Sequence, residues 1–130
     1  MALLWKATAM QTNNVIVNAA KTREEAMGIV NKSIDRWEEL IAWAAGRGSG
    51  IQNLVLFPEF NLQGFPLSED ADEWIKKACF QIPGCPEIER LQNIAQKFKI
   101  YLGANGYEAP DEWPGRYFNC SFLINPSGDV

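Results

Sequence analysis

A single glutamate, Glu59, stands where an unbroken apolar run stops at a proline. Glu59 follows the apolar run at residues 54–57, with only Pro58 between them. Proline has no N–H and a fixed φ, so it ends a central strand, and Glu59 falls just beyond the strand's carboxyl end. Ligands of open α/β sheets bind at that end, so the position favours a role for Glu59 at a ligand site. The alternative interpretation is a solvated loop glutamate after a core strand.

Two further residues are candidates for contact with a substrate. Glu108 follows the strand predicted at residues 100–104, as Glu59 follows its own strand, so both carboxylates are expected to face one crevice. The alternative for Glu108 is a solvated loop acid. Phe65 comes directly after Gly64 and is predicted to wall the pocket, with a core aromatic as the alternative.

The sequence contains no histidine, which excludes Ser-His and Cys-His catalytic pairs within this chain and the usual histidine-containing zinc sites. We therefore predict no metal site. The three cysteines, Cys79, Cys85 and Cys120, are an odd number and fit free thiols in a reducing compartment. Cys85 precedes a predicted helix, whose dipole is expected to lower the thiol pKa.

Composition favours one soluble globular domain. The chain has 130 residues, of which 47% are hydrophobic and 22% charged. Its net charge of −4 argues against nucleic-acid binding and against binding to an anionic membrane surface. No apolar run is long enough to span a bilayer, and Lys6 interrupts the apolar N-terminus, so we expect no signal peptide and a cytoplasmic location.

The first half predicts a strand–helix–strand unit that positions Glu59. Residues 3–10 are short and apolar, as in a strand. Thr22 and Glu25 form a capping-box pattern, and apolar residues then recur at spacings of three and four up to Ala44. Glycines at 46, 48 and 50 are predicted to end this helix. Residues 54–57 then read as a strand buried on both faces.

The second half adds two helices and two strands. We predict a helix at 68–80, and a second helix that begins at Pro86 and ends before Lys99. A strand at 100–104 is expected to be cut by Asn105-Gly106, followed by an exposed loop at 108–115. Residues 117–125 alternate as a strand, and 125–128 form a hairpin turn. No partner strand follows before Val130, so we expect an open strand edge and the front part of a longer domain.

The segment Phe-Pro-Glu-Phe at residues 57–60, with Gly64-Phe65 after it, resembles the glutamate motif of the nitrilase superfamily. These carbon–nitrogen hydrolases act on nitriles, amides and carbamoyl compounds. Other segments follow in the family's order, so the resemblance covers essentially the whole chain. They are Ile82-Pro83-Gly84, residues 101–105, Glu108, Phe118-Asn119 and Pro126-Ser127-Gly128.

The resemblance implies a catalytic glutamate, lysine and cysteine. The thiolate attacks the electrophilic carbon, the glutamate acts as base and then acid, and the lysine stabilises the developing negative charge. Glu59 matches the glutamate, and by resemblance Glu108 helps to order the lysine or the substrate. The lysine and the nucleophile have no match, because Cys85 lies at the wrong place and the lysine is expected beyond Val130. The chain alone is therefore expected to be inactive.

These observations predict an α/β fold, a nitrilase-like α-β-β-α sandwich present as an incomplete front half. Residues 1–130 would be the N-terminal part of a single carbon–nitrogen hydrolase domain. The resemblance implies an amide, nitrile or carbamoyl substrate, no metal or organic cofactor, and a homo-oligomer. One alternative is a non-catalytic scaffold that binds a partner through an open sheet edge. Another is a different α/β enzyme or small-molecule-binding domain in which Glu59 is incidental.

Overall fold

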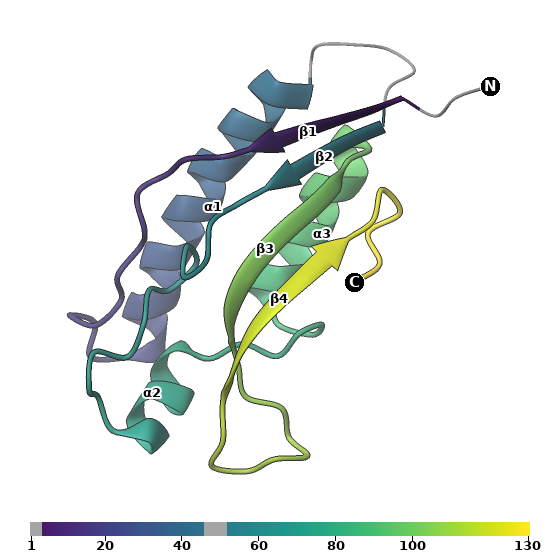
Figure 1. The fold of residues 1–130 in the computed structure, drawn as a ribbon. Coiled ribbons are helices and arrows are strands. Elements are labelled where there is room, and N and C mark those ends of the chain that lie inside the picture. The colour runs from purple at the N-terminus through teal and green to yellow at the C-terminus, as the bar shows by residue number, and fades with distance from the viewer. Residues whose placement is uncertain (1–3, 46–51) are drawn as a thin grey trace.

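The computed structural model describes residues 4–45 and 52–130, which form one four-stranded sheet with helices packed on one face (Figure 1). The strand order is β1-β2-β3-β4. The first three strands run parallel and β4 runs antiparallel to β3. The strands are β1 (Trp5–Ala9), β2 (Gln52–Leu56), β3 (Tyr101–Glu108) and β4 (Phe118–Ile124).

Two long helices cover the far side of the sheet in Figure 1, and a short helix lies at its lower end. The helices are α1 (Arg23–Ala45), α2 (Ala71–Ala78) and α3 (Pro86–Phe98). Among the described residues, no helix is long and apolar enough to cross a membrane. The strand–helix–strand unit and the two later helices predicted from the sequence are therefore present.

The capping pattern and the apolar stripe explain α1. Glu25 N–H donates to Thr22 Oγ1, and the Glu25 carboxylate accepts from Lys21 N–H, one residue earlier than an ideal capping box. The predicted stripe is buried, including Ile34, Trp37 and Ile41. The predicted stop at Gly46, Gly48 and Gly50 lies outside the described residues.

The core lies between the sheet and the two long helices. Val55 of β2 and Leu102 of β3 are partners in register and face the helices, with exposed fractions of 1% and 0%. Trp37 of α1 stacks on Phe57, with ring centroids 3.6 Å apart. This stacking fixes the chain two residues before Glu59.

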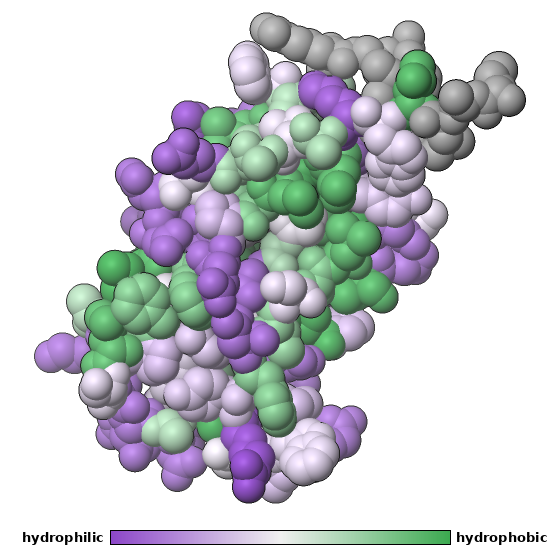
Figure 2. Space-filling view, in the orientation of Figure 1, coloured by the Kyte–Doolittle hydropathy of each residue, from purple (hydrophilic) through white to green (hydrophobic). Residues whose placement is uncertain are grey.

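Among the described residues nothing covers the other face of the sheet, which is apolar, so the expected burial of residues 54–57 on both faces is not observed in this chain. Side chains alternate along a strand, and Leu56 points away from the helices with 40% of its surface exposed. Trp5 and Leu123 are similarly exposed at 53% and 49%. Figure 2 shows hydrophobic residues gathered on this face, over the middle of the sheet.

Other expectations about the second half also need correction. Asn105-Gly106 does not cut the strand, because β3 continues through both residues to Glu108. Gly106 instead allows close packing, since an added Cβ would lie 2.8 Å from Gln63 Oε1 and 3.1 Å from the Phe80 ring. The expected open edge is present, because β4 pairs with β3 along its length and has no second neighbouring strand in the described sheet.

Candidate active site

Glu59 lies just beyond the carboxyl end of β2, as the sequence predicts. The Phe57 N–H still pairs with the Gly103 carbonyl at 3.0 Å, and Pro58 then ends the ladder. Glu59 begins a turn that runs to Gln63. Its carboxylate lines a groove of about 380 Å³ on the uncovered face of the sheet. The side chain is therefore exposed but placed at a concave surface.

The groove is polar at Glu59, Asn105 and Ser121 and apolar along the rest of its lining. Gly103 keeps the groove open, because an added Cβ would lie 2.4 Å from Leu56 Cδ2. The remaining lining residues are Leu56, Phe57, Gly103, Ala104, Phe122 and Leu123. The polar groups of the groove thus lie beside an apolar wall that includes Leu56 and Leu123 of the uncovered sheet face.

A chain of hydrogen bonds connects Glu59 to the neighbouring strands. Asn119 Nδ2 of β4 donates to Glu59 Oε1 at 2.7 Å. Asn119 Oδ1 accepts from Asn105 Nδ2 of β3 at 2.7 Å, and Asn105 Nδ2 also reaches Ser121 Oγ at 3.2 Å. Asn105 Oδ1 accepts from the Phe60 N–H at 2.9 Å. The carboxylate is thus tied to the two strands that flank the groove.

The turn after Glu59 has an unusual backbone. Phe60 has a φ of 58°, which side chains of its size rarely adopt. Its N–H is bonded by Asn105, and its carbonyl accepts from the Gly64 N–H at 3.0 Å. These bonds offset the cost of the left-handed conformation directly next to Glu59.

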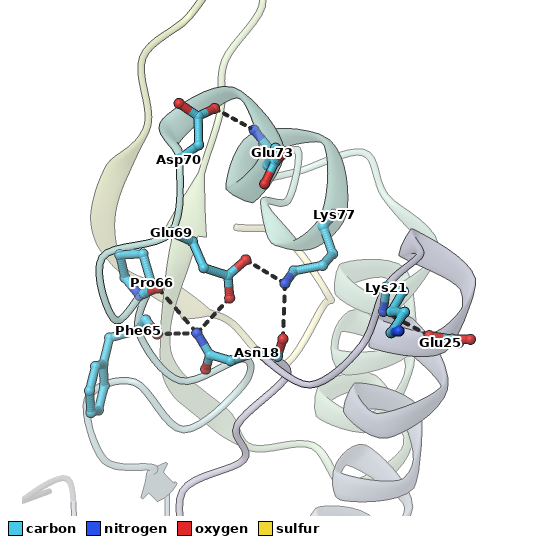
Figure 3. Close-up of polar contacts among 9 residues, drawn as sticks. All are labelled: Asn18, Lys21, Glu25, Phe65, Pro66, Glu69, Asp70, Glu73 and Lys77. Atoms are coloured by element: carbon cyan, nitrogen blue, oxygen red, sulfur yellow. Dashed lines mark hydrogen bonds and ion pairs between the residues drawn. The ribbon is translucent and has the colours of Figure 1, made fainter.

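The far end of the turn region is anchored by a cluster of Asn18, Glu69 and Lys77 (Figure 3). Asn18 Nδ2 donates to the Phe65 carbonyl at 3.1 Å and to Glu69 Oε1 at 2.7 Å. Lys77 Nζ of α2 pairs with Glu69 Oε2 and reaches the Asn18 carbonyl at 3.3 Å. The side chains of Lys77 and Glu69 are only 12% and 21% exposed. The segment that carries Glu59 is therefore held at both ends.

Phe65 does not line the groove. Its ring packs edge-on against Phe60, with centroids 5.6 Å apart, and Phe60 stacks on Tyr107 at 5.8 Å. Burial raises the pKa of the Tyr107 phenol, and the nearby Tyr117 and Glu59 act in the same direction. Phe65 is thus part of an aromatic layer that supports the turn, and its predicted contact with a substrate stays a prediction.

Glu108 does not share the Glu59 groove. Its Oε2 accepts from the Cys120 thiol at 3.2 Å. Cys120 and Asn119 are neighbours in β4, so their side chains point to opposite faces of the sheet. Because Asn119 reaches Glu59, Glu108 lies on the other face, and the expected common crevice is not observed. Strand ends alone do not say to which face a terminal side chain points.

None of the three thiols has the properties of an activated nucleophile. Burial raises the pKa of Cys79 to about 12 and is the main cause that raises the pKa of Cys120 to about 11. Burial also raises the pKa of Cys85, so the expected lowering by the helix dipole is wrong. A thiol with a pKa of about 11 is less than about one part in a thousand thiolate at neutral pH.

Among the described residues, the groove has no lysine and the chain has no cluster of side chains that could hold a metal ion. Lys6 bonds to the Ala44 carbonyl, and Lys97 pairs with Glu38 on the helical side. Within residues 4–45 and 52–130, no group of three or more His, Cys, Asp or Glu side chains is arranged to hold a metal ion.

Sequence reasoning missed the two asparagines that contact the site. Asn105 was assigned to a turn, although it lies inside β3 with 4% of its surface exposed. Asn119 carries a weak signal, because it alternates with Ser121 on the polar side of the predicted strand. Neither pattern indicates that these amides meet beside Glu59.

A comparison with models of protein families finds a match over nearly the whole chain. The family model described as carbon–nitrogen hydrolase matches residues 6–130. No sequence among the curated proteins matches the chain.

Solved structures share the fold. The chain is similar to an N-terminal amidase crystallised with a Gln-Gly peptide, at 23% identity and a TM-score of 0.68 over 95% of this chain and 25% of that chain. A carbon–nitrogen hydrolase from Helicobacter pylori G27 gives 18% identity and a TM-score of 0.65, over 95% of this chain and 36% of that chain. An amidase from Nesterenkonia sp. gives 19% identity and a TM-score of 0.60, over 95% of this chain and 39% of that chain. The chain thus spans a quarter to two-fifths of the length of these proteins, and the predicted α/β, nitrilase-like fold is confirmed.

Proposed function

The chain belongs to the carbon–nitrogen hydrolase family, and on that premise we propose that residues 1–130 form the N-terminal part of a single hydrolase domain. The domain cleaves a non-peptide carbon–nitrogen bond in an amide, nitrile or carbamoyl substrate. Of the catalytic groups of this domain, residues 1–130 supply Glu59, which transfers protons.

The observation that carries the proposal is the position of the Glu59 carboxylate. It lies at the polar end of a groove, beyond a strand end and within 2.7 Å of the Asn119 amide. In the proposed mechanism Glu59 removes the proton from an attacking thiol. It then returns a proton to the departing nitrogen, and later activates the water that hydrolyses the acyl intermediate.

The attacking thiol comes from elsewhere in the full-length protein. The raised pKa values of Cys79, Cys85 and Cys120 keep these thiols protonated at neutral pH. Glu59 has no thiol partner among the residues that the structure describes. The same holds for the lysine that would stabilise negative charge on the tetrahedral intermediate.

Several finer assignments stay predictions. Glu108 is expected to help order the lysine or the substrate, and Phe65 is expected to contact the substrate. The protein is expected to act on a small molecule, in the cytoplasm, as a homo-oligomer. The rival hypothesis, a scaffold without catalysis, would use the open sheet edges of β1 and β4, each of which has one neighbouring strand in the described sheet.

Ammonia release by the full-length protein tests the proposal. The substrates are small aliphatic and aromatic amides, the matching nitriles and carbamoyl compounds. Peptides that begin with Asn or Gln are included, because a solved N-terminal amidase holds such a peptide. We expect release from at least one class. A folded full-length protein that releases no ammonia from any of them would favour the scaffold.

A further inference from the structure

The hydrogen bonds around Glu59 run in one direction, and a backbone group sets that direction. The Phe60 N–H can only donate, so the Asn105 atom that it meets is the carbonyl oxygen. Asn105 therefore turns its NH2 group toward Asn119 Oδ1. This leaves the Asn119 NH2 group to face the Glu59 carboxylate. The orientation of both amides thus follows from the backbone of the residue next to Glu59.

We propose that Asn119, held by Asn105, is a positioning residue that fixes Glu59 Oε1 and leaves Oε2 as the atom that transfers protons. This inference rests on the proposed function. Oε2 has no hydrogen-bond partner among the residues that the structure describes, whereas Oε1 accepts from Asn119 at 2.7 Å. An exposed glutamate without such a bond would sample several rotamers. Holding one rotamer keeps the base oriented toward the groove.

The hydrogen bonds from Asn105 through Asn119 to Glu59 form a relay, and this relay requires an amide at positions 105 and 119. Asn119 accepts at one end of its side chain and donates at the other, which neither a carboxylate nor an aliphatic side chain can do. An aspartate at 119 would place a second acceptor against Glu59. Asn105 is only 4% exposed, and its loss would leave the Phe60 N–H without its side-chain partner in a left-handed turn.

Kinetics of the full-length protein separate positioning from general structure. We expect Asn119→Ala to lower kcat about tenfold to a hundredfold while KM changes little. The shorter side chain of Glu59→Asp cannot reach Asn119, so adding Asn119→Ala to Glu59→Asp is expected to cause little further loss. Asn93→Ala, which removes an exposed amide from α3, serves as the matched control. If Asn119→Ala lowers kcat by the same factor in the wild type and in Glu59→Asp, the proposal is overturned.

The relay is also observable without any activity. In ¹H–¹⁵N spectra, the Asn119 side-chain amide resonances are expected to shift in both Glu59→Ala and Asn105→Ala and to stay unchanged in Asn93→Ala. If the Asn119 side-chain resonances are unchanged in both Glu59→Ala and Asn105→Ala, the relay is overturned, regardless of the kinetic results. If the spectra shift but the full-length protein hydrolyses nothing, the relay stands as a structural contact and the proposed function fails.

Discussion

At the residue scale, burial determines how the thiols respond to pH. The pKa of Cys79 rises from its usual 9.0 to about 12, chiefly through burial. The folded state therefore keeps a proton that the unfolded chain loses, and the resulting stabilisation is complete below pH 9.0 and is lost as the pH rises toward about 12. We expect the free energy of unfolding to fall more steeply with pH in this alkaline range for the wild type than for Cys79→Ala. Urea unfolding at several pH values measures this, and parallel pH profiles would contradict it.

Gly64 tests the backbone that follows Glu59. Its φ is +75°, and an added Cβ would lie 2.7 Å from the Val15 carbonyl oxygen, a backbone atom that cannot easily move. We expect Gly64→Ala to destabilise the protein by about 2–4 kcal/mol. Gly28, on the exposed side of α1, has nothing within 4 Å of its added Cβ. Gly28→Ala is therefore expected to stabilise by about 0.5–1 kcal/mol. Thermal unfolding compares Gly64→Ala with Gly28→Ala. Equal effects of the two substitutions would contradict the close contact between Gly64 and the Val15 carbonyl.

At the element scale, the cluster of Asn18, Glu69 and Lys77 joins α2 to the segment before α1. Because both charged side chains are mostly buried, Glu69→Ala leaves the Lys77 ammonium without its ion pair. We expect a loss of about 2 kcal/mol in unfolding free energy. The matched control is Glu39→Ala, which breaks the exposed Arg36–Glu39 pair and is expected to cost less than about 0.5 kcal/mol. Similar losses from both variants would show that the cluster does not anchor the segment.

Elements with a local cause could be predicted from the sequence. The apolar stripe and Thr22 predict α1, and Pro58 places Glu59 at a strand end, because each signal lies within the segment that it describes. Asn105-Gly106 was misread because a turn signal is local, whereas its packing against Phe80 depends on tertiary structure. The contacts of the two amides beside Glu59 were not predicted for the same reason. Asn119 lies 60 residues from Glu59 in the sequence, and Asn105 lies 45 residues from Phe60.

At the scale of the whole molecule, the uncovered sheet face tests whether this chain is one layer of an α-β-β-α sandwich. Leu56 is 40% exposed here, and a second sheet in the full-length protein would bury it. We therefore expect Leu56→Asp to destabilise the full-length protein by more than about 2 kcal/mol. The control Leu67→Asp alters a loop side chain that is 57% exposed and is expected to have little effect. A Leu56→Asp protein as stable as the control would contradict a sandwich.

The most direct measurement of the central claim is kcat/KM for the full-length protein and its Glu59→Gln variant on the substrate that releases ammonia fastest. Glutamine keeps the shape of the side chain and can still accept from Asn119, but it cannot take up a proton from a thiol or water. The account predicts a loss of at least about a hundredfold with unchanged thermal stability, the lower end of what a general base contributes. A Glu59→Gln variant that keeps the wild-type kcat/KM would contradict it.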